Sequence, residues 1–194
     1  MLITWLKQRR KLRELPEAIA RVARLVDDRP AFEAEAKDVA VRFGAPAVAV
    51  LWRRLRQPTR CPPEFDFPNA RLGEWNWRWH FAIFEVCYHL REPALEFVRE
   101  TAFGPYDWPQ GNAIEILCRW AAERFERDRS LRDLRLRMPD MRAEAIDYAV
   151  GPLLNLARDN APLADVLNEL RSVPVFDESY LERRSTVANE PPTH

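Results

Sequence analysis

The sequence predicts an all-α fold built from consecutive helix pairs, and three observations lead to this prediction. Apolar residues recur at helical spacing along most of the chain. Only 5 of the 194 residues are glycine, and no Asn-Gly or Asp-Gly turn is present to close a β-hairpin. The prolines gather at the starts of the apolar segments and in two irregular stretches, which is how helical proteins use them.

The first part of the chain contains three predicted helices followed by a long loop. The helices span residues 16–27, 31–44 and 46–56, and each begins at or just after a proline. The first two bury an apolar stripe, and the third is expected to turn Val48, Leu51, Trp52 and Leu55 inward. Residues 57–72 then lose all periodicity and contain four prolines, so we expect a loop there.

The stretch GEWNWRWHFAIFEVCYHL, residues 73–90, alternates three tryptophans as a β-strand would, but its length favours a helix. On a helix, Trp75 and Trp79 share one face and Trp77 points to the other, so the three rings cannot converge on one cation. A helix that is apolar on two faces is covered from both sides. We therefore expect these tryptophans to be packed in the core.

The remaining periodic segments predict five more helices. They span residues 92–104, 109–125, 130–138, 139–160 and 162–172, and the fourth is expected to kink or split at Gly151-Pro152. Residues 173–194 lose the helical pattern and end in NEPPTH, which predicts a frayed and mostly irregular tail.

Two pairs of predicted helices match each other along the chain. PAVAVLWRRLR aligns with PALEFVRETAF, and AIFEVCYHL aligns with AIEILCRWA once the loop at residues 57–72 is treated as an insertion in the first pair. Cys87 and Cys118 occupy the same position in the two second helices, where buried structural thiols are the simplest interpretation.

This repeated unit resembles the HEAT family of helical repeats, most closely in EPALEFVRETAFGPYDWPQGNAIEILCRWAAE. Pro93 and Asp107 stand where that family has its proline and its turn aspartate, but GNA replaces the Val-Arg usual in the second helix. The resemblance implies a short right-handed α-solenoid of about nine or ten helices that acts mainly as a binding surface. On this interpretation residues 1–172 form one domain with loop 57–72 inserted, and residues 173–194 form the tail.

Composition narrows the class of protein further. Thirty basic and 30 acidic residues give zero net charge, whereas a dedicated nucleic-acid binder usually carries a basic excess. Three widely spaced cysteines suit a reducing compartment. The N-terminal residues lack the pattern of a signal peptide, and no segment has the length of apolar residues that crosses a membrane. We expect a cytoplasmic protein that binds neither membranes nor nucleic acid.

Chemistry-bearing motifs are missing from the sequence. It contains no nucleophile elbow, phosphate-binding loop, dinucleotide fingerprint or zinc-protease motif. His80 and His89 lie on opposite sides of one predicted helix, and His194 belongs to the tail, so no metal set is expected. We expect no catalytic residues, no metal and no cofactor.

Two short stretches are the candidate contact sites for a partner. The inserted loop places aromatic and acidic side chains together in Glu64, Phe65, Asp66 and Phe67. The turn between two helices holds Tyr106, Asp107 and Trp108, residue types that suit a recognition hot spot. Each stretch also has a purely structural interpretation. In the first, the loop residues fold back onto the helices, and in the second, Asp107 caps the helix that follows.

The sequence therefore favours a non-enzymatic module that binds another protein through these loop and turn surfaces. Bacterial adaptors, and immunity proteins that neutralise a toxin, include proteins of this size and general architecture. A toxin or a secretion component is therefore the expected kind of partner. The alternative is a HEAT-like DNA-binding protein of the alkylbase DNA glycosylase type, in which Asp107, Trp108 and Arg119 would face the DNA. Membrane contact through residues 1–13 is a weaker third possibility.

Overall fold

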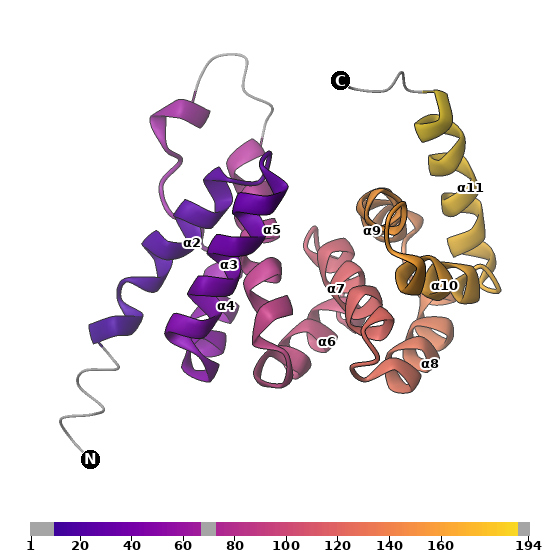
Figure 1. Cartoon of the computed structure of the whole chain (residues 1–194), viewed down its shortest axis with the longest axis horizontal. Helices are drawn as coiled ribbons and strands as arrows, with labels where there is room; N and C mark the ends of the chain where they lie inside the picture. Colours follow the sequence, from indigo (N-terminus) through magenta and orange to yellow (C-terminus); the bar gives the residue numbers. More distant parts are fainter. Residues whose placement is uncertain (1–9, 67–72, 190–194) are drawn as a thin grey trace. The chain divides into compact units, whose positions relative to one another are not determined.

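The structure is a computed structural model that describes residues 10–66 and 73–189, with side chains up to Ser185. Within these ranges the structure has a helical turn at residues 10–12, ten α-helices, α2 to α11, and four short 3-10 helices, η1 to η4, and it has no β-strand (Figure 1). The all-α prediction is confirmed. None of the helices in the described residues has the length and apolar character needed to cross a membrane.

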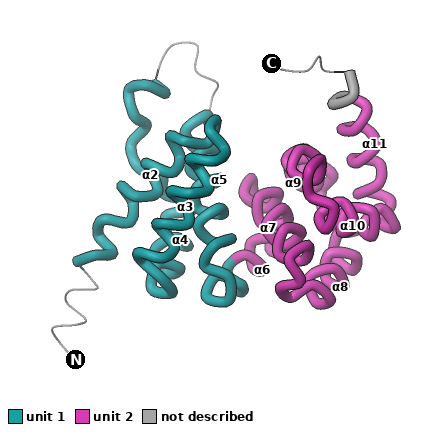
Figure 2. The backbone as a smooth tube through the Cα atoms, viewed as in Figure 1, with its two compact units in different colours: residues 1–97 teal, residues 98–194 magenta. Residues whose placement is uncertain are grey.

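The chain divides into two compact units, residues 1–97 and residues 98–194, coloured teal and magenta in Figure 2. The division falls inside α6 (Leu95–Phe103), after the first three residues of that helix. The final helix, α11, belongs to the second unit.

The first unit opens with α2 (Leu15–Arg24) and α3 (Arg29–Phe43), which pack against each other. Asp28 caps α3 by accepting a hydrogen bond from Ala31 N at 3.2 Å, and the helix ends at Gly44, whose φ of 60° favours glycine. The buried faces are those that the periodicity predicts, with Ile19 and Val22 on α2 and Phe32 on α3.

After η1 (Ala45–Ala47), α4 (Val48–Leu55) leads into the loop, which contains η2 (Pro63–Phe65). Leu51 and Leu55 are buried as predicted, but Trp52 is 46% exposed and lies with its ring centroid 4.9 Å from that of Phe97. The expectation that Trp52 points inward is therefore wrong, because one edge of α4 remains in solvent.

The helix predicted from the tryptophan-rich stretch is α5 (Glu74–Leu90), which contacts α2, α3 and α4. Three of its side chains contact backbone carbonyls, two at the end of α4 and one in the loop that follows it. Trp79 Nε1 donates to Arg54 O at 2.8 Å, His80 Nε2 lies 3.0 Å from Leu55 O, and Trp75 Nε1 donates to Thr59 O at 3.1 Å. The contacts with Arg54 O and Leu55 O involve carbonyls of the last turn of α4, and the bond to Thr59 O attaches the loop to α5.

Two charged side chains are buried in α5 among its apolar residues. Arg78 bonds to Glu74 on its own helix at 3.1 Å and to Asp27 at 2.7 Å. Glu85 lies 3.6 Å from the Arg29 guanidinium and 3.5 Å from His89 Nε2. Buried charges need such partners, and these pairings fix the position of α5 against the segments around Asp27 and Arg29.

In the first unit, η3 (Glu92–Ala94) follows α5 and leads into α6. The second unit contains the rest of α6, then α7 (Gln110–Ala122), α8 (Arg127–Arg137), η4 (Met138–Asp140) and α9 (Ala143–Ala157). Helix α7 is central, since it contacts α8, α9 and α10 (Ala161–Leu170). Helix α9 continues through Gly151 and Pro152, so of the two predicted alternatives, a kink or a split, the split does not occur.

Residues 174–189 form helix α11 (Pro174–Asn189), which packs on α9. The prediction of an irregular tail from residue 173 is therefore wrong for this segment. Val173, Phe176 and Tyr180 are buried at i, i+3 and i+7, so one narrow apolar edge anchors an otherwise polar helix. Residues 190–194, including His194, lie outside the described residues.

Candidate functional site: the turn before helix α7

The turn that precedes α7 presents the three residues that the sequence singles out. Asp107 O accepts a hydrogen bond from Gln110 N at 3.0 Å, and Asp107 Oδ1 accepts one from Trp108 N at 2.9 Å. Pro109, and not Asp107, occupies the N-cap position of α7, and no side chain caps that helix. Asp107 therefore stabilises the turn itself. The interpretation of Asp107 as the helix cap is wrong, because the N-cap position lies two residues further along the chain.

Trp108 is 61% exposed, and its ring lies against that of Tyr148 on α9, with a centroid separation of 5.4 Å. Tyr148 is itself 40% exposed. Two large aromatic side chains, one from the turn before α7 and one from α9, thus form an open ledge on the second unit. Single exposed apolar residues are common, whereas exposed apolar side chains that lie in contact with one another can mark a site for a partner.

Tyr106 continues this ledge on the other side of the turn. The Arg142 guanidinium lies 4.6 Å from the centroid of the Tyr106 ring, a cation–π arrangement. A hydrogen bond to the Glu144 carboxylate is the main reason that the pKa of Tyr106 is raised to about 12. We call the group Tyr106, Trp108, Arg142, Glu144 and Tyr148 the turn surface.

A cavity of about 260 Å³ opens beside the turn surface. It is lined by side chains from the end of α6, the turn, the start of α7 and the segment between α8 and α9: Phe103, Tyr106, Gln110, Arg137, Met141 and Arg142. Gln110 Nε2 donates to Ala102 O at 2.9 Å and to Gly104 O at 3.3 Å, which fixes the amide orientation. Its Oε1 is buried and has no hydrogen-bond partner among the described residues.

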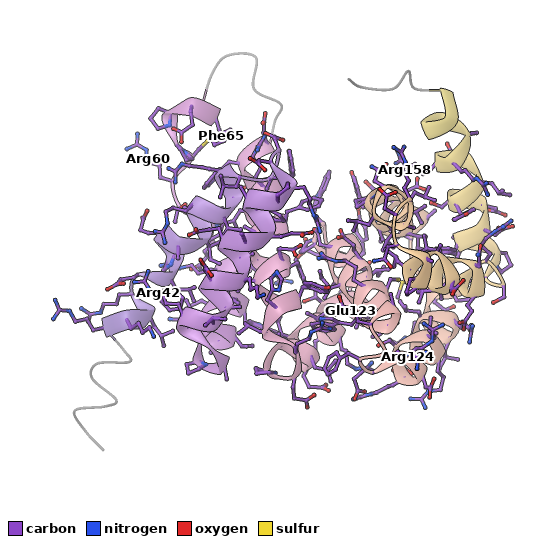
Figure 3. The ribbon with its side chains drawn as sticks, viewed as in Figure 1. Arg42, Arg60, Phe65, Glu123, Arg124 and Arg158 are labelled. Carbon is purple, nitrogen blue, oxygen red and sulfur yellow. The ribbon has the colours of Figure 1, made fainter. Side chains whose placement is uncertain are left out.

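The loop residues lie on the first unit and are engaged within it. Phe65, labelled in Figure 3, stacks on Trp75 with ring centroids 5.4 Å apart, and the Arg78 guanidinium lies 4.8 Å from its ring. Glu64 accepts a hydrogen bond from Arg24 Nε at 2.8 Å. Asp66 is exposed, and Phe67 lies outside the described residues. For Phe65 and Glu64 the structure thus has the fold-back arrangement.

The alternative DNA-facing set does not share a surface. Arg119 is only 7% exposed and pairs with Glu115 at 3.4 Å inside α7, whereas Trp108 is open to solvent. Cys87 and Cys118 are fully buried, and burial raises the pKa of both thiols far above its ordinary value, so both behave as core residues. Across residues 10–66 and 73–189 no group of three or more His, Cys, Asp or Glu side chains is placed to hold a metal ion.

Comparison of the chain with protein-family models, with curated proteins and with solved structures finds no match at the level of significance applied. The interpretation of the site therefore comes from its own geometry.

Sequence reasoning finds Tyr106, Asp107 and Trp108 but misses the α9 half of the turn surface. Arg142, Glu144 and Tyr148 lie more than thirty residues further along the chain, and each is an ordinary residue for an exposed helix. Only the packing of α9 on α7 brings them to the turn. One signal was present in the sequence, the glycine at position 111, because a glycine inside a helix often marks a close helix crossing.

Proposed function

We propose that this chain is a non-enzymatic interaction module that binds a partner protein through the turn surface. The observation that carries the proposal is the open Trp108–Tyr148 ledge, with both rings exposed and in contact. Trp, Tyr and Arg are the residue types most enriched where binding energy concentrates at protein interfaces. The turn surface contains all three.

The ledge is also preorganised, which favours binding. Trp108 rests on Tyr148, Tyr106 is held by Arg142 and Glu144, and the turn is closed by hydrogen bonds of Asp107. Fixing these side chains before association reduces the entropy lost when a partner binds. The adjoining cavity of about 260 Å³ would accept one side chain of the partner beside the ledge.

The finer architecture that we propose is a HEAT-like series of helix pairs. Its support is the equivalence of α5 and α7: the aligned residues are buried in both helices, namely Ala82 and Ala113, Ile83 and Ile114, Val86 and Leu117, Cys87 and Cys118, and Leu90 and Ala121. A repeat that buries the same positions twice is the pattern such proteins show.

Within this proposal the partner is another protein, and a bacterial toxin or a secretion component is the kind of partner we favour. An adaptor or immunity protein acts by occupying a surface of its partner, so it needs an exposed contact patch and no catalytic group. The turn surface provides such a patch. The loop residues Phe65 and Glu64 contribute to folding of the first unit in this account, and contact is assigned to the turn surface.

The experiment is affinity capture with the tagged chain from cells of its source, followed by identification of the retained protein and a binding measurement with both proteins purified. The wild-type chain should retain a partner that Trp108→Ala loses. Leu136→Ala is the matched control, because Leu136 is also a large exposed apolar residue of the second unit. A partner retained equally by both variants would place the contact elsewhere.

A further inference from the structure

The second unit contains another cavity, of about 360 Å³, whose lining consists of apolar side chains and two arginines. Its lining comes from three helices, α9, α10 and α11: Leu154, Ala157, Arg158, Ala164, Leu167, Tyr180 and Arg184. Small-molecule sites are usually concavities of about 300–1,000 Å³ with mostly apolar walls and few polar groups. This cavity, which we call the α9–α11 cleft, lies at the lower end of that range.

The apolar walls follow from the sequence. Leu167 and Tyr180 are almost fully buried, while Ala157 and Ala164 have side chains too small to fill the space between their helices. Small residues facing large ones leave a concavity where three helices meet. Aliphatic or aromatic groups of a ligand would bind there more favourably the more apolar surface they bury.

Two arginines complete the lining, and they differ from neighbouring arginines in their ion pairing. Arg171 pairs with Asp177 at 2.6 Å, and Arg183 lies 3.9 Å from Asp147. Arg158 and Arg184 are exposed, and neither forms an ion pair with another residue of the described chain. Arg158 is labelled in Figure 3, where it stands at the end of α9.

No acidic side chain belongs to the described lining of the cleft. Its charge is therefore that of two guanidinium groups beside an apolar floor. Guanidinium groups bind carboxylates through paired N–H donors, and such charge-assisted hydrogen bonds are about twice as strong as neutral ones. A ligand complementary to this arrangement has an apolar body and one anionic end.

We propose that the α9–α11 cleft binds a small aliphatic carboxylate, with its hydrocarbon body against Leu167 and Ala164 and its carboxylate on Arg158 and Arg184. The site is separate from the turn surface, since the two share no lining residue. The inference therefore does not depend on the proposed function.

The test is calorimetric titration of the full chain with octanoate, octan-1-ol and octylammonium, all kept below their aggregation concentrations. Octanoate should bind saturably, octanol more weakly, and octylammonium least. The double variant Arg158→Gln/Arg184→Gln should weaken octanoate by about tenfold or more, because charge-assisted hydrogen bonds are lost, and should leave octanol unchanged. Both positions are exposed, so the variant is expected to fold.

A second variant tests the cavity itself. Ala164→Leu should fill the cleft and abolish binding of octanoate and octanol, while Trp108→Ala should leave both unchanged. Equal binding of octanoate and octylammonium would overturn the proposal, as would octanoate binding that the double arginine variant does not weaken. Chain binding to phosphatidylglycerol vesicles without any octanoate binding would also overturn it, because the cationic rim would then serve a membrane surface.

Discussion

Gly111 on α7 lies directly against Tyr148 on α9. A Cβ atom at position 111 would stand 2.6 Å from Tyr148 Cβ and 2.9 Å from the carbonyl oxygen of Ala145, distances that real Cβ atoms do not occupy. The absence of a side chain at Gly111 therefore lets the two helices approach. Because Tyr148 carries the ring on which Trp108 rests, this contact also positions the turn surface.

Gly111→Ala should lower the free energy of unfolding by about 1–3 kcal/mol, because the added methyl meets backbone atoms of α9 that cannot yield alone. Gly151→Ala is the matched control, since a Cβ at Gly151 has nothing within 4 Å and alanine favours the helix by up to about 1 kcal/mol. Urea unfolding followed by circular dichroism measures both. Equal stability of the two variants would contradict the close crossing.

Trp79 and Trp77 should respond differently to replacement by phenylalanine. Trp79 is fully buried and donates to Arg54 O, so Trp79→Phe should cost about 1–3 kcal/mol through the lost bond and the void. Trp77 is partly exposed and makes an edge contact with Phe81, so Trp77→Phe should change stability by less than about 0.5 kcal/mol. Chemical unfolding of the two variants provides the comparison, and a reversed order would disprove the assignment of faces on α5.

Phe65→Ala should destabilise the first unit by about 1–2 kcal/mol, because the ring packs between Trp75 and the Arg78 guanidinium. Glu64→Gln should destabilise the first unit much less than Phe65→Ala does, because the ion pair of Glu64 with Arg24 is exposed to solvent. Hydrogen exchange of the α5 amides measures the local effect. If Phe65→Ala left the stability of α5 unchanged but weakened partner binding, the loop would be a contact site after all.

Tyr106 should make the free energy of unfolding depend on pH in alkaline solution. Its pKa is about 12 in the folded protein against about 10 in an unfolded chain, mainly because it hydrogen-bonds to Glu144. The folded state holds the phenolic proton more tightly, so this contribution is complete below pH of about 10 and is lost as the pH rises toward 12.

Ultraviolet titration of phenolate absorbance checks this prediction, with Tyr106→Phe as the difference standard. The variant should lack the phenol that ionises near pH 12, and its stability should fall less steeply between pH of about 10 and 12. A Tyr106 that titrates with the unfolded-state pKa would show that the hydrogen bond to Glu144 does not form in solution.

Most of the fold could be predicted from apolar periodicity. Nine of the helices, α2 to α10, bury apolar residues whose helical spacing is visible in this single sequence. Helix α11 could not, since only Val173, Phe176 and Tyr180 anchor it and the other positions look like a polar tail. Its helical state depends on α9, a partner segment that periodicity does not identify.

Buried charge was the other feature that pattern reading missed. Arg78 and Glu85 lie within a stretch that the sequence presents as apolar, and their burial depends on Asp27 and Arg29 from a distant segment. The same holds for the turn surface: Trp108 could be predicted to lie at a turn, but its contact with Tyr148 requires the tertiary crossing at Gly111. Contacts between residues far apart in sequence are set by packing, which local pattern does not encode.

The most direct test of the account is the dissociation constant of the captured partner for three forms of the purified chain: wild type, Trp108→Ala and Leu136→Ala. Truncating a central aromatic of an interface costs about 2 kcal/mol or more. The account predicts that Trp108→Ala weakens binding at least about thirtyfold, whereas Leu136→Ala stays within about twofold of wild type. A Trp108→Ala variant that is folded and binds as tightly as wild type would contradict the assignment of the turn surface as the contact site.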